Sequence, residues 1–278
     1  MDLLKYVTQR QATSLLLKGS PGMSMLEDGL ALARHLLKTS DLDGHPDFLM
    51  VAPMAKKKTI GVEEIMPIIS LGAYPPVHGS RSIAIIDGMD KLTVAAQNKL
   101  LILLETNPYV FVIGVCYGDV IDTVKSRMRI IPYHPYTKSE FLCKSGLPEE
   151  EGELFYYATA GCIGFISTLK GERDLFKALK VACGSDTKRK DLYSILHLVK
   201  EKDKQAVTED PFLQQAVLRV LIFLFQKQSE YAYSAKDFEK AARYNDIVIR
   251  LIADEKLSER STYSKNDFFT TIMYCVEH

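Results

Sequence analysis

The first half of the chain alternates short apolar runs with segments of helical periodicity, and this alternation constrains the fold most strongly. The runs end at Gly, Pro or polar residues, as buried strands do; they are Thr13–Lys18, Phe48–Val51, Ser82–Ile86, Val110–Cys116 and Met128–Tyr133. Helices are expected between them at Met25–Lys38, Val62–Leu71, Val94–Glu105 and Asp119–Arg127. Right-handed strand–helix–strand connections then predict an α/β domain with a parallel five-stranded sheet and flanking helices.

From about Thr137 the strand pattern disappears, and the remaining chain reads as helices. Thr137 and Glu140 fit a capping box, and a helical pair follows at Gly161–Lys170 and Glu172–Cys183. After Gly184–Lys190 we expect four more helices, with start signals at Asp210-Pro211, Ser234 and Ser264. The expected domains are an α/β domain over 1–136, a small helical domain over 137–184 and a helical bundle over 185–278.

Composition narrows the classes of function. Lys plus Arg and Asp plus Glu each number 35, and this zero net charge argues against a whole-surface grip on nucleic acid, although a local basic patch stays possible. Five scattered cysteines without a C-x-x-C pair disfavour both a disulfide framework and a zinc site, so we expect no metal. The start of the sequence has no long apolar run, and Val217–Phe225 is too short to span a membrane. We therefore expect a soluble, cytoplasmic protein.

The turn after the first strand is where a phosphate-binding loop would lie. Such a loop, G-x-x-x-x-G-K-[ST], needs a second Gly, a Lys for the phosphate oxygens and a hydroxyl for Mg²⁺. Here the eight positions are Gly19, Ser20, Pro21, Gly22, Met23, Ser24, Met25 and Leu26, so those three are Ser24, Met25 and Leu26. Losing the Lys and the Mg²⁺ ligand costs about 3–6 kcal/mol of binding. The turn is either a degenerate phosphate loop or an ordinary strand-to-helix turn.

Asp87 and Asp90 follow the third strand. An acidic residue at the end of a parallel strand is the usual Mg²⁺-coordinating group of a nucleotide site, with a second acid to polarise water. The alternative is that Asp87 caps the strand and Asp90 the following helix. Without a Lys at 25 or a hydroxyl at 26, these carboxylates alone would make a poor catalyst.

Several motifs in the same order resemble the replicative clamp-loader branch of the AAA+ superfamily. Residues 91–108 are similar to D-K-[ML]-T-x-x-A-x-N-x-L-L-K-x-L-E-E-P-P, and His45-Pro46-Asp47 to H-P-D. Downstream, residues 126–128 resemble S-R-C, and residues 160–165 resemble G-S-x-G-R-A. The resemblance covers residues 15–170 and is nearest to the delta-prime subunits of bacterial DNA polymerase III. It implies an AAA+ domain, a helical lid domain and a C-terminal helical collar domain for oligomerisation.

The resemblance also implies roles for individual residues. Arg127 falls on an arginine finger that acts on the ATP site of a neighbouring subunit, with Ser126 supporting the turn; Arg129 is a nearby competitor. The alternative is that Arg127 is a cation at a helix C-terminus. Phe165 falls where ATP-using members carry a sensor Arg, and residues 38–44 lack the zinc module of many relatives.

Three functions follow as expectations. The first is a non-catalytic clamp-loader subunit without cofactor, assembling with gamma/tau-like motors and delta and acting through the complex on the sliding clamp and primer-template DNA. Apolar faces of Phe212–Phe225 and Phe238–Ile252 would then supply the collar contacts. The second is an ATPase in its own right, with Lys18 or Lys91 replacing the missing Lys. The third is a binding module outside replication.

Overall fold

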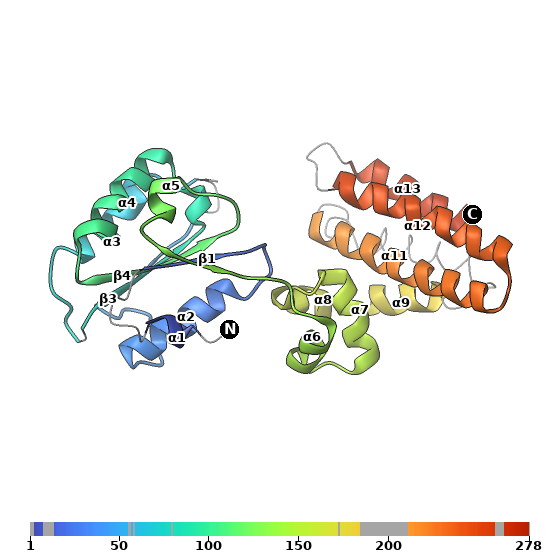
Figure 1. Cartoon of the computed structure of the whole chain (residues 1–278), viewed down its shortest axis with the longest axis horizontal. Helices are drawn as coiled ribbons and strands as arrows, with labels where there is room; N and C mark the ends of the chain where they lie inside the picture. Colours follow the sequence, from blue (N-terminus) through green and yellow to red (C-terminus); the bar gives the residue numbers. More distant parts are fainter. Residues whose placement is uncertain are drawn as a thin grey trace. The chain divides into compact units, whose positions relative to one another are not determined.

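Five buried strands organise the first half of the chain, as their apolar sequences predict. In the computed structural model they are β1 (Leu15–Lys18), β2 (Phe48–Val51), β3 (Ser82–Asp87), β4 (Val110–Cys116) and β5 (Arg129–Pro132). All neighbouring pairs are parallel and their order is β2-β3-β4-β1-β5. The predicted parallel five-stranded sheet is confirmed (Figure 1).

The structure describes residues 3–7, 14–54, 57, 59–78, 80–171, 173–183, 211–258 and 264–277. The chain divides into two compact units, Met1–His134 and Pro135–His278. The predicted boundary at residue 184 falls where a stretch outside the described residues begins. The division into lid and collar domains therefore stays a prediction.

Helices cover both faces of the sheet in the first unit (Figure 1). One face is covered by α3 (Val62–Leu71), α4 (Val94–Thr106) and α5 (Asp122–Lys125), with the 3-10 helix η1 (Met89–Lys91) beside them. On the other face lie α1 (Leu4–Val7) and α2 (Met25–Leu37). Gly29 of α2 faces the sheet, since a Cβ there would be in ordinary van der Waals contact with Ile113 and Leu17.

The helix predicted over Asp119–Arg127 is wrong in extent, since α5 is a single turn, Asp122–Lys125. Val120 points into the core, where it is buried. Ile121 has an extended backbone, with φ −61° and ψ 148°, and its N–H donates to the Gln97 side chain instead of a helical carbonyl. The residues before Asp122 therefore cannot join the helix.

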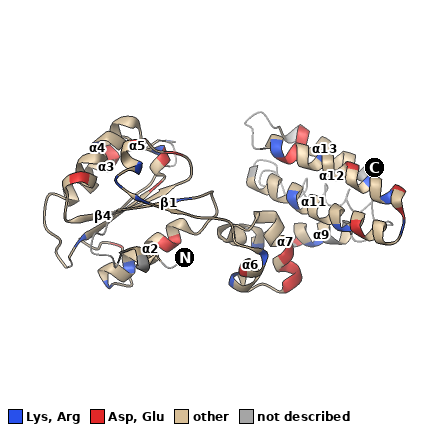
Figure 2. Cartoon of the chain, in the orientation of Figure 1, with Lys and Arg blue, Asp and Glu red and all other residues tan. Residues whose placement is uncertain are grey.

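The second unit is helical throughout the residues that are described. Its elements are α6 (Lys138–Ser145), α7 (Glu149–Thr159), η2 (Ile163–Phe165), α8 (Ile166–Gly171), α9 (Arg173–Cys183), α11 (Pro211–Ser234), α12 (Phe238–Ser258) and α13 (Lys265–Glu277). One apolar core runs through them, and α11 packs against α7, α9 and α12. Figure 2 shows acidic residues at the start of α7. Glu149, Glu150 and Glu151 lie in the first turn of this helix, where the positive end of the helix dipole favours negative charge.

Several sequence expectations for this unit need correction. The predicted capping box of Thr137 and Glu140 is present, but α7 was not predicted. Ser234 ends α11 rather than capping α12; the N–H of Lys240 donates to Asp237 instead. Three of the four helices expected after residue 190 are described, and the fourth lies outside the described residues.

The expected collar face of Phe212–Phe225 also needs correction. Every residue of that stretch is buried or half-buried inside the unit, because α11 is surrounded by other helices. Large apolar side chains that are exposed lie further on: Tyr231, Tyr233, Phe238, Ile249 and Leu257.

Candidate functional site

The turn between β1 and α2 is held to the sheet on both sides. The N–H of Gly19 donates to the carbonyl of Cys116 at 3.1 Å, and the N–H of Tyr133 donates to that of Lys18 at 2.7 Å. The Tyr133 hydroxyl then reaches Asp28 of α2 at 2.8 Å. The turn formed by residues 19–26 is thus fixed at the carboxyl ends of β1, β4 and β5, where ligands of parallel sheets bind.

Methionine side chains fill the inside of this turn. The N–H of Ser20 donates to the Sδ of Met23 at 3.3 Å, and Met25 is fully buried. A Cβ on Gly19 would lie 2.8 Å from the Sδ of Met23 and 3.1 Å from that of Met25. A thioether therefore occupies a backbone donor that a phosphate loop would offer to its ligand, and an uncharged side chain stands at the Lys position.

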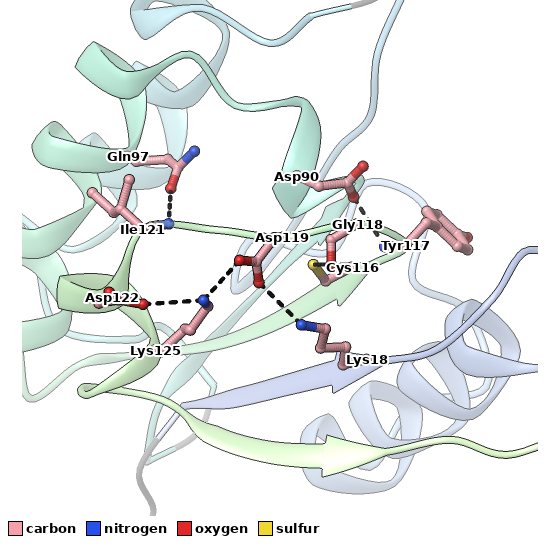
Figure 3. Close-up of polar contacts among 10 residues, drawn as sticks. All are labelled: Lys18, Asp90, Gln97, Cys116, Tyr117, Gly118, Asp119, Ile121, Asp122 and Lys125. Atoms are coloured by element: carbon pink, nitrogen blue, oxygen red, sulfur yellow. Dashed lines mark hydrogen bonds and ion pairs between the residues drawn. The ribbon is translucent and has the colours of Figure 1, made fainter.

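Asp87 and Asp90 are both bonded to Tyr117, which directly follows β4. The Tyr117 hydroxyl donates to Asp87 at 3.2 Å. The Tyr117 backbone N–H donates to Asp90 at 2.9 Å, as Figure 3 shows. Burial and the negative charge of Asp87 raise the pKa of Tyr117, so the phenol keeps its proton and stays a donor. Both candidate metal ligands are therefore engaged by the protein itself.

The lysines considered as replacements for the missing Lys are also paired. Lys18 lies 3.0 Å from Asp119, and Lys91 lies 3.4 Å from Asp90. Asp119 also accepts a hydrogen bond from Lys125 at 2.8 Å (Figure 3). The bonds from Lys125 and Lys18 lower the pKa of Asp119 to about 2, so it stays ionised and holds both ammonium groups.

Ser126 and Arg127 follow α5 at the surface. The Nη1 of Arg127 donates to the carbonyl of Thr123 at 2.9 Å and to the Ser126 hydroxyl at 3.2 Å, while Nη2 pairs with Glu105 at 2.5 Å. These contacts match the alternative interpretation of Arg127 as a cation at a helix end. The side chain is still 35% exposed, so part of the guanidinium is accessible to a partner.

The remaining predicted residues lie elsewhere. The guanidinium of Arg129 stacks over the Tyr6 ring, 4.6 Å from its centre. Phe165 belongs to the second unit, where its ring stacks on Phe212 at 3.8 Å. An aromatic core contact thus stands where ATP-using relatives are expected to carry the sensor Arg.

Three residues of the site were missed by the sequence interpretation: Gln97, Glu105 and Tyr117. Gln97 is buried and donates to the carbonyl of Leu92 at 3.0 Å. Its side-chain oxygen accepts from the N–H of Ile121 at 2.9 Å, as Figure 3 shows. The signal available in the sequence was a polar residue, Gln97, among the apolar positions of α4 that face the core. Tyr117 could have been found from its place after β4, because β3 and β4 end side by side.

The parallel sheet and the turn after β1 agree with what comparisons with known proteins found. The family model described as DNA polymerase III, delta subunit, matches residues 5–137. Those residues are therefore similar to a subunit family of the DNA polymerase III clamp loader. No curated protein matches this sequence.

One solved structure supports the fold. A DNA polymerase III gamma-subunit-related protein of Thermotoga maritima is 15% identical, with a TM-score of 0.55 and coverage of 99% of this chain and 97% of that chain. At this identity the likeness concerns the fold alone. Two variants of RuvB from Thermotoga maritima are 13% and 12% identical, each with a TM-score of 0.43 and coverage of 86% and 79%.

Metal ligands and membrane-spanning helices can be assessed for the described parts of the chain. There, no group of three or more His, Cys, Asp and Glu side chains could hold a metal ion. None of the helices in those parts is long and apolar enough to cross a lipid bilayer.

Proposed function

We propose that this protein is a non-catalytic, delta-prime-like subunit of a DNA polymerase III clamp loader. It would assemble with gamma/tau-like motor subunits and delta and assist ATP-driven loading of the sliding clamp onto primer-template DNA. Its own contribution to ATP hydrolysis would be Arg127, supplied to the ATP site of a neighbouring subunit.

The single observation that carries this proposal is the methionine-filled turn. Ser20 donates its N–H to Met23, and Met25 is buried where a phosphate loop has its Lys. Triphosphate binding depends on free backbone donors and that ammonium group. A turn that lacks the Lys and has its Ser20 donor occupied by Met23 favours a subunit that binds no nucleotide of its own.

Arg127 has the chemistry that the proposed role needs. Its guanidinium is always charged and planar, so it can donate two parallel hydrogen bonds to phosphate oxygens. It stands on a surface turn rather than in the core, with its side chain 35% exposed. Exposed apolar residues of the second unit, Tyr231, Phe238 and Ile249 among them, are candidates for contacts with other subunits.

An ATPase that works alone is the competing function, and the pairing of the lysines opposes it. Lys18 and Lys91 would each have to leave a carboxylate before meeting phosphate. Asp87 and Asp90 already accept hydrogen bonds from Tyr117, so part of their capacity as ligands is used before Mg²⁺ binds. Calorimetric titration of the isolated chain with Mg-ATP separates the two functions: micromolar binding would favour the ATPase.

The decisive experiment replaces Arg127 in a complex reconstituted with the cognate motor subunits. Arginine fingers contribute about 10³–10⁵ to the turnover of the site they serve. We expect Arg127→Ala to abolish DNA-stimulated ATP hydrolysis at the neighbouring site, while Arg129→Ala, the matched control, leaves it near the wild-type rate. Normal ATPase activity with Arg127→Ala would remove the proposed role.

A further inference from the structure

Glu105 occupies an unfavourable place in its own helix. It lies in the last turn of α4, where the exposed carbonyl groups carry partial negative charge and disfavour an acidic side chain. The last turn of α4 contains no basic residue that could compensate. The stabilising partner of Glu105 comes from 22 positions away, in the turn after α5, and is Arg127.

The contacts of Arg127 use a defined part of its guanidinium. Nη1 donates to the Thr123 carbonyl and the Ser126 hydroxyl, and Nη2 forms an ion pair with Glu105. A guanidinium has five N–H donors. Within the described parts of the chain, Nε makes no hydrogen bond and Nη2 makes only this ion pair, and a planar guanidinium can offer donors on that side to a phosphate.

We propose that Glu105 is a positioning residue for Arg127, which fixes the guanidinium in one orientation and leaves Nε and Nη2 donors for a phosphate of a neighbouring subunit. This inference rests on the proposed function of Arg127. A flexible Arg loses side-chain freedom when it binds phosphate, and a partner that orients it beforehand reduces that cost. Because the ion pair is about 40% exposed, its effect on affinity or rate is modest.

The test is a double-mutant cycle in the reconstituted complex, read as DNA-stimulated ATP hydrolysis. The variants are Glu105→Ala, Arg127→Ala and their combination, with Glu63→Ala as the control for loss of an exposed glutamate elsewhere. We expect Glu105→Ala to lower the rate about two- to fivefold, as loss of a half-exposed ion pair does. In the Arg127→Ala background the same change should have no further effect.

Two further readouts separate positioning from a purely structural role. Glu105→Gln keeps a side-chain oxygen beside Nη2 but removes the negative charge, so its rate should lie between those of wild type and Glu105→Ala. The melting temperature of each free variant is measured beside the rate; if Glu105→Ala unfolds, Glu105→Gln carries the comparison.

Each outcome bears on a different statement. An unchanged or raised rate with Glu105→Ala overturns the positioning role, as does an equal loss in the Arg127→Ala background. If Arg127→Ala itself leaves the rate unchanged, the proposed function fails and the positioning role fails with it. If Arg127→Ala abolishes hydrolysis and Glu105→Ala does nothing, only the role of Glu105 is lost.

Discussion

Replacing Asp47 tests how a buried carboxylate holds the edge of the sheet next to β2. Its side chain is 1% exposed, and its two oxygens accept from the N–H groups of Val77 at 2.6 Å and His78 at 2.7 Å. Burial alone would raise the pKa of Asp47, but these two hydrogen bonds outweigh it and the pKa is lowered. The carboxylate therefore ties the segment before β3 to the amino end of β2.

The loss of free energy of unfolding follows from the two N–H donors that would lose their acceptor. Asp47→Ala leaves the N–H groups of Val77 and His78 without their acceptor, at about 1–3 kcal/mol each, so we expect a loss of about 2–6 kcal/mol. Asp47→Asn keeps one oxygen but turns an amide NH₂ toward the other N–H, and should cost about half as much. Asp43→Ala, which removes an exposed carboxylate nearby, is the control.

The assay is hydrogen exchange of the Val77 and His78 amides, together with urea unfolding of the first unit. The lowered pKa fixes the pH dependence: the ionised carboxylate stabilises the fold above the pKa of the unfolded chain, and this contribution is lost as pH falls through the lower, folded pKa. The difference between wild type and Asp47→Asn should thus shrink below about pH 4. Losses below 1 kcal/mol at pH 7 in both variants would refute the reasoning.

Two further substitutions test the turn and the buried amide. Gly19→Ala should lower the free energy of unfolding by about 1–3 kcal/mol, because its Cβ would lie 2.8 Å from the Sδ of Met23. Gly171→Ala is the control and should be neutral, since the space around its Cβ is open. Equal thermal stability of the two variants would contradict the packing argument. Gln97→Leu should lower the free energy of unfolding by about 2–4 kcal/mol, because the buried N–H of Ile121 and the carbonyl of Leu92 lose their hydrogen-bond partner. Urea unfolding measures this loss, with Asn98→Ala at an exposed position as the control. Wild-type stability of both variants would contradict the prediction.

The sheet could be predicted from the sequence because burial on both faces leaves a local signal. Runs such as Val110–Cys116 are apolar throughout and stop at polar residues, so their ends were predicted to within one or two residues. The helix α7 gave no such signal, since its sequence contains Gly152. That glycine allows close packing of α6, because a Cβ there would lie 2.5 Å from Leu142; tertiary contact thus outweighs low helix propensity.

The candidate site was predictable in its positions but not in its contacts. Counting residues was enough to place Met25 at the Lys position of a phosphate loop. That Met23 accepts the N–H of Ser20, or that Tyr117 bonds both Asp87 and Asp90, depends on how loops from different strands meet. The pairing of Glu105 with Arg127 joins the end of one helix to the turn after another, and no local pattern contains it.

The methionine packing of the turn after β1 has a thermodynamic consequence. A protein that binds a ligand only when folded gains stability by mass action, about 2.7 kcal/mol at a ligand concentration of one hundred times Kd. If the turn packed by Met23 and Met25 binds no nucleotide, as we propose, it has no such linkage. We then expect the melting temperature to be the same at every concentration of Mg-ATP. Such constancy fits the proposed role of a subunit that keeps one shape while its neighbours bind and hydrolyse ATP.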